Sequence, residues 1–90
     1  MGIALFKIKL MPESTSVDLI KLQDFVKEAI DRVGGKATDF EEQDIAFGLK
    51  ALIVGVRISE DIDGNKIEEV LAKIEGVSSL DIIDYRRAIN

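Results

Sequence analysis

Ile45-Ala46-Phe47-Gly48-Leu49-Lys50-Ala51-Leu52 marks the point at which this chain of 90 residues is expected to reverse between two β-strands. A polar, acidic segment (residues 36–44) precedes it, and a strongly apolar segment (residues 49–58) follows it. A short run bounded in this way is typical of a β-hairpin. The pattern therefore predicts a hairpin with Phe47 at its tip.

An aromatic side chain at a hairpin tip has two interpretations. Loop tips are usually solvated and polar, so Phe47 is a candidate for contact with another molecule. Aromatic residues also serve as anchors at the centres of interfaces. The alternative is that Phe47 folds back and covers the end of the chain's own core, and the sequence leaves both interpretations open.

The two strands that flank the hairpin differ in their expected burial. Phe40 is the only large apolar side chain in residues 36–44, which is typical of a solvated edge strand. Residues 49–58 are apolar on both faces, which indicates a central strand. Gly55 within that strand predicts a bulge or the close packing of a neighbour.

The N-terminal part of the chain predicts a strand followed by a helix. Residues 3–11 alternate between apolar and polar side chains, and Pro12 ends the pattern because proline lacks the backbone donor. We expect Ser14, Thr15 or Ser16 to start the helix. Its buried stripe would contain Leu22, Phe25, Val26, Ala29, Ile30 and Val33, before Gly34 and Gly35 end it.

The C-terminal part repeats this helix and strand. Residues 59–65 predict a turn, and a second helix starts around Asn65, with Glu68 placed to complete its cap. Gly76 ends the helix, whose buried stripe contains Ile67, Val70, Leu71 and Ile74. Residues 77–87 alternate weakly. We expect Leu80 and Ile82 on one face of this last strand, and Ile83 and Tyr85 on the other.

The element order β-α-β-β-α-β is that of a ferredoxin-like α+β sandwich. Right-handed crossovers give an antiparallel sheet in the order 4-1-3-2, with both helices on one face. We expect residues 1–90 to form one domain, since a chain of this length has no room for a second.

The composition narrows the classes of function. The chain contains no Cys and no His, which excludes thiol chemistry and lowers the expectation of an enzyme or a metal site. The formal net charge of −5 opposes nucleic-acid binding. Its apolar runs are too short to span a bilayer, and the N-terminus has no signal-peptide pattern, so we expect a cytoplasmic protein with no membrane partner.

Two acidic groups are candidate cation or catalytic sites. Asp61-Ile62-Asp63-Gly64-Asn65 is similar to half of a calcium loop, but the position of the bidentate glutamate is occupied by Val70. A turn with a helix cap is the simpler interpretation, although cation binding by Asp61 and Asp63 stays open. The other acidic group, on the expected edge strand, contains Glu41, Glu42 and Asp44.

The basic residues Arg86 and Arg87 end the last strand, directly after Tyr85. Most terminal charges are solvated, and these two would then only keep an edge strand soluble. Alternatively, a guanidinium held at a rigid strand end can enter a phosphate or metal site of another molecule.

Across its whole length, the chain resembles the archaeal-type elongation factor 1-beta family, the guanine-nucleotide exchange factors of elongation factor 1-alpha. The motifs are Lys9-Leu10-Met11-Pro12-Glu13-Ser14, Ile45-Ala46-Phe47-Gly48-Leu49-Lys50-Ala51-Leu52, Ile74-Glu75-Gly76-Val77, and the basic end of residues 81–87. The family fold is ferredoxin-like, in agreement with the element order.

This resemblance implies an exchange factor without covalent chemistry or a cofactor, whose partner is the GTPase elongation factor 1-alpha. In the family, an aromatic hairpin tip wedges into the GTPase near its nucleotide, and the matching residue is Phe47. A basic residue disturbs the Mg²⁺ and phosphate region, and the match is Arg87, with Arg86 as the alternative. Gly48 and Lys50 of the matching hairpin are also expected to bind the partner.

Three other classes of function share parts of this pattern. RNA-recognition modules have the same element order, but their exposed sheet face would here carry Leu5, Lys7, Ile53 and Tyr85, which is a poor match. A small-molecule sensor domain is the second class. A carboxylate enzyme is the third, and no motif supports it.

Overall fold

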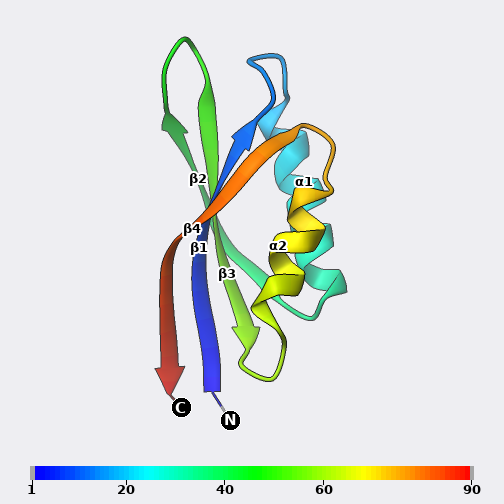
Figure 1. Cartoon of the computed structure of the whole chain (residues 1–90), viewed down its shortest axis with the longest axis vertical. Helices are drawn as coiled ribbons and strands as arrows, with labels where there is room; N and C mark the ends of the chain where they lie inside the picture. Colours follow the sequence, from blue (N-terminus) through cyan, green and yellow to red (C-terminus); the bar gives the residue numbers. More distant parts are fainter. Residues whose placement is uncertain (1, 90) are drawn as a thin grey trace.

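Strands and helices follow one another in the expected order, β-α-β-β-α-β, in a computed structural model (Figure 1). It describes the backbone of residues 2–89 and the side chains of residues 2–87. The elements are β1 (Gly2–Pro12), α1 (Leu19–Arg32), β2 (Lys36–Asp44), β3 (Lys50–Ser59), α2 (Gly64–Ala72) and β4 (Val77–Ile89).

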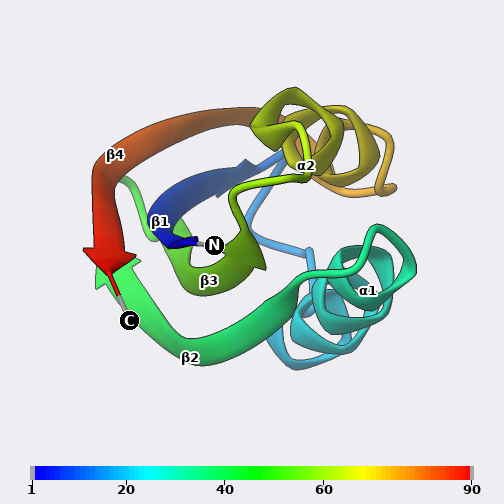
Figure 2. The ribbon, with the colours of Figure 1, turned by 90° about the horizontal axis from the view of Figure 1, so that it is seen from below.

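The four strands form one antiparallel sheet in the order β2-β3-β1-β4. This is the predicted order 4-1-3-2, counted from the opposite edge of the sheet, so the prediction is confirmed. Both helices cover one face of this strongly twisted sheet (Figure 2). Alternate residues of the two central strands pack beneath the helices because successive side chains of a strand point to opposite faces. The most buried of them are Ile8, Leu10, Leu52, Val54 and Val56.

The structure corrects the predicted caps of both helices. Asp18, not Ser14, Thr15 or Ser16, caps α1, and its side chain accepts hydrogen bonds from the backbone of the first turn. Asp63 caps α2 by accepting from the Asn65 backbone N–H at 2.9 Å. α2 begins at Gly64, in agreement with the predicted start around Asn65, but Asp63 provides the cap that was expected to involve Glu68. In both cases a carboxylate next to the helix satisfies backbone donors that would otherwise lack a partner.

The predicted faces of β4 are wrong at Tyr85. The pairing with β1 shifts between Lys7 and Ile8, so that Ile83 is an extra residue in β4. This bulge reverses the alternation of the residues that follow. Tyr85 therefore lies opposite Phe6 on the helix-covered side, with the two ring centroids 4.9 Å apart.

The prediction for Phe25 is wrong, whereas the prediction for Gly55 is confirmed. Phe25 was expected in the buried stripe of α1, but 56% of its surface is exposed. Gly55 does mark a bulge, because the pairing of β2 with β3 shifts next to it, between Ala37 and Asp39. A Cβ at Gly55 would overlap the side chains of Thr38 and Asp39, which explains the need for glycine.

Candidate partner-binding surfaces

The turn between β2 and β3 has an unusual backbone. The Leu49 N–H donates to the Ala46 carbonyl at 2.9 Å, so residues 46–49 form a β-turn. Its two central residues both have positive φ, 56° at Phe47 and 80° at Gly48. This combination defines a type I′ turn, which favours asparagine, aspartate or glycine at both positions. Phe47 is the only non-glycine residue with positive φ in the described part of the chain.

Among the side chains of residues 2–87, Phe47 is also the most exposed large apolar one, with 99% of its surface accessible. The structure thus excludes the interpretation that it covers the core. A bulky residue in the left-handed region costs about 1–3 kcal/mol, and here no burial offsets that cost. Backbone strain combined with full exposure of an aromatic ring marks a candidate binding residue.

Other apolar side chains surround this turn. Ile45 is 39% exposed and Ile20, in the first turn of α1, is 71% exposed. Ile20 and Gly48 line the same open hollow of about 340 Å³, and a Cβ at Gly48 would lie 3.7 Å from the Thr15 methyl group. The residues that lie together at this end of the molecule are Thr15, Ile20, Ile45, Phe47 and Gly48.

Lys50 lies at the base of the same hairpin. It pairs with Asp44 in the sheet, and its Nζ is 3.8 Å from the Glu42 carboxylate. The structure therefore brings three of the predicted residues, Phe47, Gly48 and Lys50, to one end of the sheet (Figure 1).

Arg86 and Arg87 lie at the other end, and their side chains leave opposite faces of β4. Arg87 donates two hydrogen bonds to Glu60, from Nε to Oε1 at 2.9 Å and from Nη2 to Oε2 at 2.8 Å. Arg86 makes a single ion pair, 3.2 Å from its Nε to Asp84 Oδ2. The Arg87 guanidinium is therefore held by two hydrogen bonds to one carboxylate, whereas the Arg86 guanidinium is held by a single ion pair.

The pair of Glu60 and Arg87 affects the titration of both groups. The hydrogen bonds from Arg87 lower the pKa of the Glu60 carboxyl below its ordinary value. The same bonds raise the pKa of Arg87. Both groups are therefore charged at neutral pH.

The two predicted groups of residues are far apart. Arg87 pairs with Ala4, which pairs with Ile58 in β3. Phe47 precedes Ile58 by eleven residues, and a strand rises roughly 3.3 Å per residue, so Phe47 and Arg87 are about 36 Å apart. This is most of the 43 Å length of the molecule. The two groups do not form one compact site.

Ile20 and Glu60 are candidate functional residues that the sequence interpretation missed. Ile20 is a large apolar residue outside the buried stripe of α1, and this position in the sequence could have indicated a binding residue. Glu60 is separated from Arg87 by 27 positions, and their pairing depends on the sheet register. No local pattern in the sequence indicates it.

Three of the acidic side chains, those of Glu42, Asp61 and Asp63, make contacts within the fold. Asp63 caps α2, and Asp61 Oδ2 accepts from the Ser59 hydroxyl at 3.5 Å. Glu42 pairs with Lys50. Residues 2–87 contain no cluster of three or more acidic side chains arranged to hold a metal ion. In the same part of the chain, neither helix has the length and apolar character to cross a bilayer.

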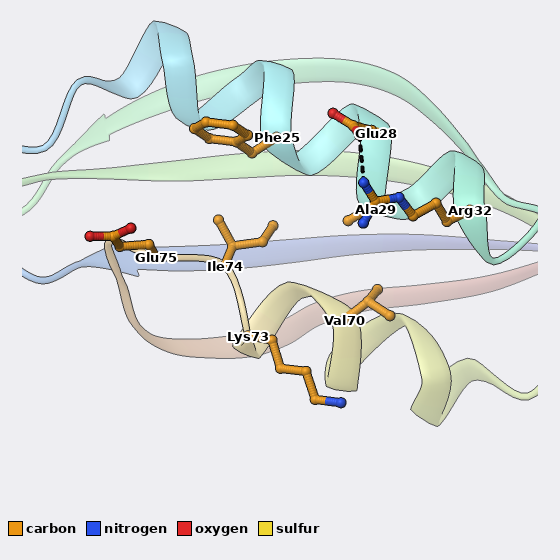
Figure 3. Close-up of a pocket in the computed structure, with 8 residues that line it drawn as sticks. All are labelled: Phe25, Glu28, Ala29, Arg32, Val70, Lys73, Ile74 and Glu75. Carbon is orange, nitrogen blue, oxygen red and sulfur yellow. Dashed lines mark hydrogen bonds and ion pairs between the residues drawn. The ribbon is translucent and has the colours of Figure 1, made fainter.

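A groove of about 370 Å³ separates α1 from α2 (Figure 3). Phe25 projects from α1 on one side, and Val70 and Ile74 lie on the other. Glu28 and Arg32, also on α1, pair with each other beside it. None of the predicted site residues lines this groove.

The fold places the chain among ferredoxin-like α+β domains, with exposed Phe47 at one end of the sheet and Arg86 and Arg87 at the other. Residues 5–88 match the family described as the EF-1 guanine nucleotide exchange domain. The chain therefore belongs to the EF-1 guanine nucleotide exchange domain family.

Archaeal relatives agree with this assignment. The chain is 40% identical to an elongation factor 1-beta of Methanosarcina barkeri over 88 residues, which cover 97% of this chain and 99% of the relative. It is 42% identical to that of Methanothermobacter thermautotrophicus, over 97% and 98% of the two chains. It is 34% identical to that of Sulfolobus acidocaldarius, over 89% and 90%.

Proposed function

We propose that residues 1–90 act as one exchange domain that accelerates the release of GDP from an elongation factor 1-alpha GTPase in the cytoplasm. Membership of the exchange-domain family supports this function. The single observation that carries the proposed mechanism is the fully exposed Phe47 on a strained turn. An apolar ring in that position is costly in the free protein, and burial in a partner would offset the cost.

Exchange of this kind needs no bond making or breaking by the domain. A protein that binds the nucleotide-free GTPase more tightly than its Mg²⁺-GDP form weakens GDP binding by the same factor, because the two equilibria are linked. The domain therefore needs only contacts that are better with the nucleotide-free form.

Phe47 is proposed to supply one such contact. The type I′ turn holds its ring away from the sheet, and Gly48 permits the turn. Ile20 and Ile45 would extend the apolar contact around the ring, and Lys50 would add a charge at its rim. Insertion of the ring between elements of the partner would favour a conformation that binds the nucleotide more weakly.

Arg87, with Arg86 as the alternative, is proposed to supply the other contact. A guanidinium near the Mg²⁺ ion competes with the metal for the same phosphate and carboxylate oxygens. Loss of the metal removes a clamp on the β-phosphate of GDP. The separation of about 36 Å between Phe47 and Arg87 means that the two ends would touch different parts of the partner.

The function is tested by GDP release from the cognate elongation factor 1-alpha, followed with a fluorescent GDP analogue. Wild-type protein at saturating concentration should accelerate release, and Phe47→Ala and Arg87→Ala should both reduce the acceleration. Ile20→Ser should raise the half-saturating concentration, whereas Ile83→Ser, an exposed isoleucine away from both ends of the sheet, should not. Unchanged GDP release with the wild-type protein would refute the function.

A further inference from the structure

The pair of Glu60 and Arg87 joins two segments at the end of the sheet opposite the hairpin. Glu60 directly follows β3, and Arg87 lies near the end of β4. The two parallel hydrogen bonds, at 2.8 and 2.9 Å, engage both carboxylate oxygens and one edge of the guanidinium. Bidentate pairs of this geometry fix the direction of the arginine side chain.

The position of Glu60 is itself fixed by a third segment. Its backbone N–H donates to the Gly2 carbonyl at 3.1 Å. A Cβ at Gly2 would overlap the Glu60 carboxylate, so the missing side chain leaves the space in which the carboxylate lies. The start of β1, the end of β3 and the end of β4 therefore meet around one ion pair.

In the free protein, the ion pair occupies the Arg87 guanidinium. Its charge is balanced by Glu60, and two of its donor groups are already used. A guanidinium that arrives at a metal site with its carboxylate would also bring a group that attracts the metal. Arg87 acts most strongly as a cation only after it separates from Glu60.

We propose that Glu60 is a positioning residue that restrains Arg87 in the free protein and releases it to an anionic site of the partner. This inference rests on the proposed exchange function. The acceptor is a phosphate or carboxylate of the partner's nucleotide site, which replaces the Glu60 oxygens. Glu60 then sets how readily Arg87 is delivered, and it does so only through Arg87.

The experiment measures maximal GDP-release rate and half-saturating concentration for wild type, Glu60→Gln, Arg87→Ala and the double variant. Glu60→Gln should raise the maximal rate about two- to fivefold, the range expected for the loss of an exposed ion pair of good geometry. In the Arg87→Ala background the same substitution should change the rate by less than about 1.5-fold, because its effect passes through Arg87.

Glu28→Gln is the matched control. It makes the same change in net charge and breaks another exposed ion pair, Glu28 with Arg32 on α1, so it should leave both kinetic values unchanged. Gly2→Ala is a second variant, because its methyl group would displace the flexible Glu60 carboxylate and keep the charge. It should raise the maximal rate in the same direction. Melting temperatures of all variants check that each one folds.

The outcomes separate this inference from the function on which it rests. If wild-type protein does not accelerate GDP release, the proposed function fails, and the inference fails with it. If wild-type protein is active but Glu60→Gln is equally fast or slower, only the inference is overturned. It is also overturned if Glu60→Gln accelerates the Arg87→Ala protein as much as the wild type, or if Arg87→Ala is fully active.

Discussion

At the scale of single residues, Phe47 carries a conflict between stability and binding. Its φ of 56° disfavours a bulky side chain, whereas Asn-Gly is the preferred pair for a type I′ turn. Phe47→Asn should therefore raise the free energy of unfolding by about 1 kcal/mol, as measured by urea denaturation. The same variant should lose most of its acceleration of GDP release.

A matched control for this prediction is Phe25→Asn. Phe25 is also an exposed aromatic residue, but it lies on helix α1 and not in a turn. Asparagine there should not raise stability, because it is a weaker helix former. A Phe47→Asn protein that is less stable than wild type would contradict the argument from backbone strain.

The ion pair of Glu60 predicts a pH dependence of stability. Arg87 holds the pKa of Glu60 below the ordinary value of 4.5, so the pair stabilises the native state above that pH. The contribution is lost as pH falls through the lowered pKa. The melting temperature of wild type should exceed that of Glu60→Gln at pH 7, and the gap should close towards pH 3. A gap that is equally large at pH 3 and pH 7 would contradict this prediction.

At the scale of elements, the bulge between β2 and β3 depends on Gly55. A methyl group there would overlap Thr38 and Asp39, and Thr38 already donates to Asp39 at 2.9 Å. Gly55→Ala should therefore lower the free energy of unfolding by about 1–3 kcal/mol in urea denaturation. Arg57→Ala, exposed on the same strand, should change it by less than about 0.5 kcal/mol. Equal effects of the two substitutions would count against the overlap.

The strands and helices were predictable because the spacing of apolar residues is a local property of the sequence. The alternation of residues 3–11 and the two-sided apolar pattern of residues 49–58 identified β1 and β3 and their central places. The face of Tyr85 was not predictable, because one extra residue in β4 reverses the alternation and leaves no local mark. Asp18 was missed as a cap because three nearby hydroxyl residues offered the same chemistry.

The candidate site was predictable only in part, for a similar reason. Phe47 was identified because an aromatic residue at a turn is conspicuous in the sequence. Its strained backbone and full exposure are properties of the folded turn. The pairing of Glu60 with Arg87 depends on strand register across the sheet, and register is a long-range property.

At the scale of the whole molecule, the sheet separates the two proposed contacts. The two proposed contacts lie about 36 Å apart, on a molecule 43 Å long, and the central strands β1 and β3 connect them. A GDP molecule is much shorter than this distance, so Phe47 and Arg87 do not both reach it. Each end should therefore contribute to exchange through its own contact with the partner.

Independent contacts predict multiplicative effects in a double-variant experiment. The fold reductions in GDP-release rate caused by Phe47→Ala and Arg87→Ala should multiply, within about a factor of two, in the double variant. Residues this far apart with no shared neighbours seldom couple in free energy. Glu60→Gln with Arg87→Ala is the opposite case, because those side chains touch and their effects should not multiply. If either Phe47→Ala or Arg87→Ala alone removes as much activity as the double variant, the two ends act as one unit, and the model of two separate contacts is wrong.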